Sequence, residues 1–139
     1  MEKVTHVYEL PYPPSVNHYW RRVGARTLIS RGGRVFRGDV CVLLGGSGPR
    51  KPPSDGRIAL CMDAFPPDRR RRDLDNIQKP VLDALEHAGV YEDDSQVDLL
   101  ITRRGPVLDG GNIRVRIEPL PLSRCPLCGG LIASGVEAN

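Results

Sequence analysis

The architecture of the chain follows from a strand and a helix in residues 57–97, whose sequence is RIALCMDAFPPDRRRRDLDNIQKPVLDALEHAGVYEDDSQV. In residues 57–65 apolar side chains occupy every second position from Ile58 to Ala64, which predicts a β-strand with one buried face. Two prolines at positions 66 and 67 follow, and proline cannot continue a ladder of backbone hydrogen bonds. The strand is therefore expected to end at this break.

Residues 76–88 carry the clearest helical pattern in the chain, because their apolar side chains recur every three or four positions. Asp75 or Asn76 can cap the start of this helix, and Gly89 can end it. Pro80 is compatible with a helix only in or just after the first turn. The helix is therefore predicted to begin near Asn76.

Shorter elements are predicted on both sides of this unit. We expect strands over residues 4–10, 96–103 and 112–118, the last two pairing as a hairpin. A short helix is expected around residues 36–44, with Phe36, Val40, Leu43 and Leu44 near one face. This order predicts a single α+β domain with a mixed sheet flanked by helices.

The length of the chain, 139 residues, fits one compact domain. We expect this domain to span residues 1–120 and to be followed by a tail over residues 121–139. No apolar run reaches the roughly 18–20 residues of a membrane span, and the first residues lack the apolar core of a signal peptide. A cytoplasmic protein without a membrane partner is the expected class.

Arginine dominates the basic residues, because all but three of the 20 Lys and Arg residues are Arg. The formal net charge is only +3. Residues 15–37 alone hold six arginines and no acid. The guanidinium fork matches the oxygens of a phosphate, so this composition favours phosphate-bearing partners such as nucleic acid. A GC-rich genome, which enriches Arg, Gly and Pro together, would produce a similar composition.

Charged residues are densest just before the predicted helix. Arg69 to Arg72 repel one another and cannot all be buried, and Asp73 and Asp75 follow directly. Side chains two residues apart in an extended segment point to the same side, so both carboxylates can face one Mg²⁺ ion. Lys79 lies one helical turn beyond Asp75, where it can face a phosphate.

A second acidic group, Glu92 to Asp94, follows the helix. A helix over residues 76–88 is about 20 Å long at about 1.5 Å per residue. The segment after it must return almost fully extended, at about 3.3 Å per residue, to bring Asp94 back to Asp75. Otherwise Asp94 completes a site on a second subunit. A purely structural interpretation is also open, because aspartates at this spacing often cap helices or pair with surface arginines.

Residues 66–97, from PPDRRRRDLDN to YEDDSQV, resemble the central motif of the RusA family of Holliday junction resolvases. The segment ELPYPPSVNHYWRR at residues 9–22 is similar to the N-terminal part of that family, and the whole resemblance spans residues 5–118. It implies a homodimeric, Mg²⁺-dependent endonuclease, with Mn²⁺ as a substitute, that makes paired symmetric cuts in four-way DNA junctions. It would act in recombination and repair in the cytoplasm of a bacterial cell or a phage-infected host.

The resemblance also implies roles for individual residues. The catalytic, metal-binding aspartates of the family fall on Asp73, Asp75 and Asp94, and its catalytic lysine falls on Lys79. The side chains expected to contact DNA are basic or amide groups from the arginine run and the N-terminal segment: Arg69, Arg70, Arg71, Arg72, Asn17, Arg21 and Arg22. Pro80 and the segment after Glu118 depart from the family pattern.

Two further functions are compatible with the same sequence. The first is a protein that binds four-way junctions or single-stranded DNA without cutting, in which the acidic cluster is only structural. The second is an interaction adaptor that works through the tail. In that tail CPLCGG, with Cys125 and Cys128, is similar to one half of a zinc ribbon. Zinc needs four ligands, so a second subunit or a partner would have to complete the site, or the motif is a residual half.

Overall fold

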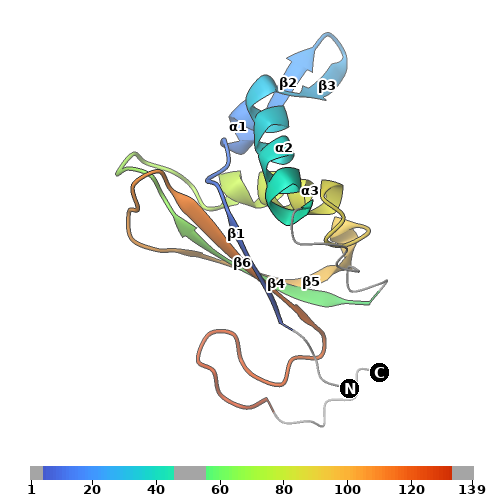
Figure 1. Cartoon of the computed structure of the whole chain (residues 1–139), viewed down its shortest axis with the longest axis vertical. Helices are drawn as coiled ribbons and strands as arrows, with labels where there is room; N and C mark the ends of the chain where they lie inside the picture. The colour runs from blue at the N-terminus through green and yellow to red at the C-terminus, as the bar shows by residue number, and fades with distance from the viewer. Residues whose placement is uncertain (1–4, 46–55, 133–139) are drawn as a thin grey trace.

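The computed structural model describes residues 5–45 and 56–132, apart from the side chains of Val16 and Asn17. Its main body has two layers, a four-stranded sheet and two helices that lie across one face of it (Figure 1). The strands of this sheet are β1 (His6–Leu10), β4 (Ile58–Phe65), β5 (Val97–Arg104) and β6 (Asn112–Pro119), in the order β1-β6-β4-β5. The helices are α2 (Arg31–Gly45) and α3 (Asp75–His87). The predicted α+β domain with a mixed sheet is confirmed.

The predicted hairpin of β5 with β6 is wrong, because β4 lies between these two strands. Met62 of β4 is opposite Thr102 of parallel β5 on one side and Val115 of antiparallel β6 on the other. The chain passes from β5 to β6 around the end of β4, where the Gly105 N–H donates to the Ala64 carbonyl at 2.8 Å. Strand alternation in the sequence indicates which face is buried, but it does not indicate the neighbouring strand.

One core lies between the sheet and the helices. From the sheet it takes alternate apolar side chains of β4 and β6, which are almost completely buried as predicted for β4. The helices contribute Phe36 and Val40 of α2 and Val81 and Leu85 of α3 to the same core. Leu43 is instead 52% exposed, so its predicted place on the buried face of α2 is wrong. Among the described residues, no helix is long and apolar enough to cross a membrane.

Helix α3 begins one residue before its predicted start, and no side chain caps it. Leu74 occupies the cap position, and the Asn76 N–H donates to the Asp73 carbonyl at 3.2 Å. The predicted cap by Asp75 or Asn76 is therefore wrong, because a backbone carbonyl takes that role. The carboxylates of Asp73 and Asp75 are consequently not used to close the first turn.

The other end of α3 matches the prediction. Gly89 adopts a φ of +78°, which an L-residue with a side chain rarely adopts. The Val90 N–H donates to the Leu85 carbonyl at 3.0 Å, and the Gly89 N–H donates to the Glu86 carbonyl at 3.0 Å. This pair of bonds is the Schellman ending of a helix. It turns the chain back along the helix toward the second acidic group.

The basic segment over residues 15–37 forms an arm that projects from the helical layer (Figure 1). It consists of α1 (Val16–Tyr19), an antiparallel hairpin of β2 (Trp20–Val23) with β3 (Arg26–Ile29), and the start of α2. The hairpin is not among the predicted elements. Its signal is Gly24, whose φ of +61° suits the first position of a two-residue turn.

A polar contact ties this arm to α3. The buried Tyr19 hydroxyl donates to the Asp83 carboxylate, and Arg37 Nη2 donates to the same Asp83 oxygen at 2.8 Å. Burial by itself raises the pKa of Asp83, but the hydrogen bonds from Tyr19 and Arg37 outweigh it and lower the pKa. Asp83 is therefore an ionised carboxylate shared by α1, α2 and α3.

Replacing this shared carboxylate should destabilise the protein. Asp83→Ala leaves Arg37 without its partner, and we expect a loss of about 2–3 kcal/mol in the free energy of unfolding in urea. This is less than for a fully buried pair, because 24% of the Arg37 side chain is exposed. Asp39→Ala, at an exposed position of α2, is the matched control, with an expected change within about 0.5 kcal/mol.

The same contribution depends on pH. Because the folded-state pKa of Asp83 is lowered, its stabilisation is fully present above the ordinary carboxyl pKa and is lost as the pH falls through the lower value. The difference in stability between wild type and Asp83→Ala should therefore shrink in acid. A difference that stays constant from neutral pH into acid would contradict this account of the contact.

Candidate functional site

The predicted site residues Asp73, Asp75 and Lys79 lie at the start of α3. Asp73 precedes the helix, Asp75 is its first residue and Lys79 follows one turn later, and all three side chains are exposed. Residues four apart on a helix share a face, so Asp75 and Lys79 are neighbours on the surface. Since the first turn is closed by backbone, both carboxylates are available to a ligand.

The fourth predicted residue, Asp94, lies against the same helix. It begins the short 3-10 helix η1 (Asp94–Gln96), and its Oδ2 accepts a hydrogen bond from Lys79 Nζ at 2.9 Å. Its backbone N–H donates to Glu86 Oε1 at 3.2 Å. The chain that leaves α3 thus returns to the middle of the helix, where Asp94 meets Lys79 of its own chain.

A buried amide holds the returning loop in place. Gln96 is 6% exposed, and its Oε1 accepts the N–H groups of Glu92 at 2.9 Å and Asp93 at 3.1 Å. The Asp93 carboxylate in turn accepts the Ser95 N–H at 2.8 Å, which completes a capping box. Gln96 is not among the predicted site residues. The Asp-x-x-Gln spacing at residues 93–96 is the signal that could have revealed this cap.

The acidic residues group differently from the prediction. In the described ranges, the one set of three acids whose oxygens lie within 4.8 Å of one another is Glu86, Asp93 and Asp94. Asp73 and Asp75 belong to no such set there. The structure therefore brings Asp94 to Lys79 and Glu86, and it does not bring Asp94 and the two earlier aspartates into one cluster.

Lys79 is a stable cation in this setting. The hydrogen bond with Asp94 raises the pKa of Lys79 and outweighs the opposing effect of partial burial. A lysine with a raised pKa remains protonated near neutral pH. Its chemistry is consequently that of a positive charge and a proton donor, and not that of a general base.

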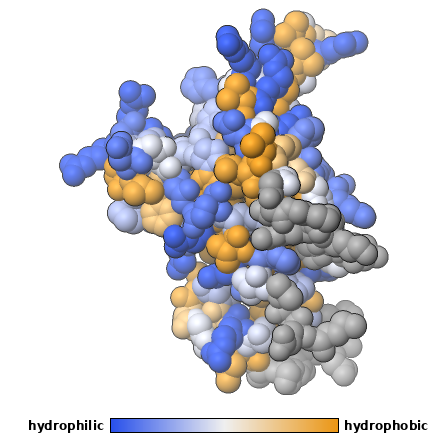
Figure 2. Space-filling view, viewed as in Figure 1, coloured by the Kyte–Doolittle hydropathy of each residue, from blue (hydrophilic) through white to orange (hydrophobic). Residues whose placement is uncertain are grey.

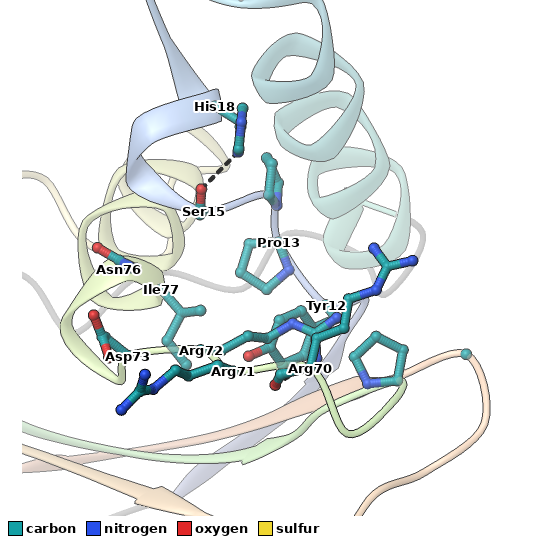
Figure 3. A pocket seen from close by; sticks show the side chains of 13 residues that line it. Tyr12, Pro13, Ser15, His18, Arg70, Arg71, Arg72, Asp73, Asn76 and Ile77 are labelled. Atoms are coloured by element: carbon teal, nitrogen blue, oxygen red, sulfur yellow. Dashed lines mark hydrogen bonds between the residues drawn. The ribbon is translucent and has the colours of Figure 1, made fainter.

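A pocket of about 550 Å³ opens beside the start of α3 (Figure 3). Its lining joins the segment before α3 to the segment between β1 and α1, and includes Arg70, Arg71, Asp73, Asn76, Tyr12 and Ser15. The pocket thus places the predicted acid Asp73 beside the arginine run. Its arginines suit an anionic group that approaches the start of α3.

The four arginines of the run are not equivalent. Arg72 Nη1 donates to Asp68 Oδ1 at 2.7 Å, and its guanidinium lies 5.6 Å from the centre of the Tyr12 ring. Within the described residues, no hydrogen bond or ion pair engages the side chains of Arg69 and Arg71, which are exposed. Arg72 therefore orders the segment, and Arg69 and Arg71 remain available to a ligand.

The arm carries further unengaged basic groups. Arg21 and Arg22 lie on β2 with exposed side chains, and no hydrogen bond or ion pair engages them in the ranges that the structure describes. Asn17, the remaining predicted contact, lies in α1, but its side chain is outside the described part of the structure.

The cysteines of the tail lie in a tight turn near the end of the described chain. The neighbouring backbone N–H groups of Cys128 and Leu127, together with the Cys128 thiol, lower the pKa of Cys125. Cys128 is exposed. Within the described residues, no third Cys, His, Asp or Glu joins these two thiols in a group of metal-ligand spacing.

Comparison with known proteins agrees with the sequence motifs. Residues 11–118 match the family model described as endodeoxyribonuclease RusA. The crossover junction endodeoxyribonuclease of Enterobacteria phage HK97 is 43% identical over 117 residues, which are 81% of this chain and 93% of the relative. That of Enterobacteria phage 82 is 39% identical, and that of Escherichia coli K12 is 37% identical, each over 120 residues, 84% of this chain and 96% of the relative.

The ordering role of Arg72 can be tested on its partner. Hydrogen bonds from the Arg72 side chain and the Arg70 backbone lower the pKa of Asp68 to about 2. In an NMR titration, Arg72→Ala should move the Asp68 midpoint back toward an ordinary carboxyl value. Arg71→Ala should leave the midpoint unchanged. An Asp68 midpoint that is the same in wild type and Arg72→Ala would contradict this role.

Proposed function

The chain belongs to the RusA family, and we propose on this premise that it is a crossover junction endodeoxyribonuclease. It would hydrolyse phosphodiester bonds in four-way DNA junctions during recombination and repair, in the cytoplasm of a bacterial or phage-infected cell. The observation that carries the proposal is the head of α3. There Asp75 and the protonated Lys79 share one face of the helix, and Asp73 lines the same pocket as Arg70 and Arg71.

The available carboxylates fit a divalent cation of the Mg²⁺ type. Such an ion is usually held by one or two carboxylates, together with waters and substrate phosphates. Within the described residues no cap or ion pair occupies the oxygens of Asp73 and Asp75, and the carboxylate of Asp94 binds Lys79. These three residues would hold Mg²⁺, or Mn²⁺ in its place, and Asp94 would have to leave Lys79 and Glu86 to join the other two carboxylates. When bound, the ion would polarise the scissile phosphate and activate a water molecule.

Lys79 supplies positive charge beside that position. Its ammonium is held by Asp94, so it enters the reaction already protonated. In this form it can hydrogen-bond a phosphate oxygen and stabilise the negative charge that develops there. Gln96 and Glu86 support this arrangement, because they fix the loop from which Asp94 reaches the helix.

Arginines without a partner among the described residues would bind the phosphates of DNA. Arg69 and Arg71 lie next to the candidate site, and Arg21 and Arg22 lie on the projecting arm. A guanidinium group can bind two oxygens of one phosphate, and such contacts to the DNA backbone carry no base specificity. A homodimer would present two equivalent sites to two strands of like polarity, which accounts for paired symmetric cuts.

The carboxylate at the head of the helix provides the main test. Asp75→Asn should reduce cleavage of a labelled mobile four-way junction in Mg²⁺ by more than about 100-fold. Loss of a residue that only supports a ligand typically costs about 10–100-fold. Junction binding should persist or tighten, because a negative charge facing phosphate is removed.

Asp39→Asn, an exposed aspartate on α2, is the matched variant and should cut like wild type. Linear duplex DNA serves as the control substrate. Full cleavage by Asp75→Asn would exclude the assigned site. Tight junction binding with no Mg²⁺-dependent product from the wild-type chain would favour the alternative, a non-catalytic protein that binds junctions or single strands.

Phosphate contacts should also appear in the salt dependence of binding. Arg71→Ala should reduce the slope of log affinity against log salt concentration by about 1, since one neutralised phosphate is lost. Arg57→Ala is the control. Arg57 precedes the first residue of β4, whereas the arginine run follows the last, and Arg57 is paired with Asp98. An unchanged slope for Arg71→Ala, measured by filter binding or anisotropy, would remove this residue from the DNA surface.

A further inference from the structure

The tail that follows the nuclease match contains a small hydrogen-bonded turn. Residues 124–131, the cysteine turn, begin and end with a β-bridge between Arg124 and Leu131. Inside this bridge the Cys125 N–H donates to the Gly130 carbonyl at 2.7 Å, and the Gly129 N–H donates to the Cys125 carbonyl at 2.8 Å. The Arg124 side chain adds a further bond, from its Nη1 to the Gly129 carbonyl at 3.0 Å. The turn is thus closed by its own hydrogen bonds.

One sulfur of the turn accepts a backbone hydrogen bond. The Gly130 N–H donates to the Cys128 sulfur at 3.4 Å. Gly129 makes this possible with a φ of +74°, which a residue with a side chain rarely adopts. A donor aimed at a sulfur stabilises the thiolate, the form in which cysteine binds a metal.

The surroundings of the turn distinguish a metal site from a redox site. A redox Cys-x-x-C pair usually lies at the N-terminus of a helix that follows a strand, and that helix activates one thiol. No helix starts at Cys125 or Cys128, which lie in a hydrogen-bonded turn. Two thiolates at this spacing in a tight turn are the usual half of a tetrahedral zinc site.

Further sulfur or imidazole ligands would have to come from another molecule. Structural zinc takes four ligands, and the described part of the chain places no third ligand with these two thiols. The remaining stretches, residues 1–4, 46–55 and 133–139, contain no Cys or His in the sequence. The turn itself is open to a partner, since Leu127 is 64% exposed and Leu131 is 77% exposed. Figure 1 shows it beyond the sheet, at the end of the molecule opposite the arm.

We propose that Cys125 and Cys128 form half of a Zn²⁺ site, and that the same two cysteines of a second copy of the chain complete it. A two-fold axis through the ion supplies four sulfurs, two from each copy of the turn, so no additional residue is needed. Each thiol releases its proton to solvent when it binds the ion. The approach of the two turns covers the exposed Leu127 and Leu131 side chains.

Metal content is the first measurement. The full chain, purified with Zn²⁺ and then desalted, should retain about one zinc ion for two chains. Cys125→Ser and Cys128→Ser should lose it, whereas Cys41→Ser, on α2, should retain it. Co²⁺ in place of zinc should give the strong absorption of a tetrahedral thiolate site in wild type and in Cys41→Ser alone.

The number of sulfurs around the ion tests the second copy. X-ray absorption should show four sulfur neighbours around the zinc ion. Each turn has two cysteines, so four sulfurs require two chains. Two sulfurs with one zinc per chain would overturn the shared site, and zinc content equal in wild type and Cys125→Ser would overturn the site altogether. Junction cleavage is not used as a readout, so the result is independent of the proposed nuclease function.

Discussion

The burial of one face of α3 against the sheet governs what the rest of this protein can do. Val81 and Leu85 lie in the same core as the alternate side chains of β4, so the helix cannot rotate about its axis without exposing them. The opposite face is thereby fixed toward solvent. It carries Asp75 and Lys79 one turn apart, so the packing of the core sets the orientation of the candidate site.

Two polar contacts then bring distant segments to this helix. Asp83 holds the basic arm through Tyr19 and Arg37, and the loop ordered by Gln96 delivers Asp94 to Lys79. Both contacts satisfy buried or half-buried polar groups, which are costly to leave without partners. The candidate site and the basic arm are therefore attached to one rigid element. The cysteine turn lies apart from it and needs no part of this arrangement.

Local signals in the sequence identified most elements but not their neighbours. The alternation of residues 57–65 and the spacing of residues 76–88 gave the central strand and the helix to within a residue or two. The same kind of alternation in β5 and β6 suggested a hairpin, although both strands pair with β4. Register and partner depend on the path of the connecting segments, which side-chain periodicity does not encode.

The residue types at the candidate site follow from the sequence alone: an Asp pair, a lysine one turn later and an acidic group after the helix. Their mutual positions came only from the tertiary structure. Asp94 lies beside Lys79 and Glu86, because the Schellman ending of α3 and the Gln96 cap fix the path of the loop back to the helix. The sequence likewise does not indicate that Arg72 and Arg71 have different roles. Only the tertiary structure shows that Arg72 pairs with Asp68. The sequence determines which chemical groups are present, but packing determines the distances between side chains that are remote in the sequence.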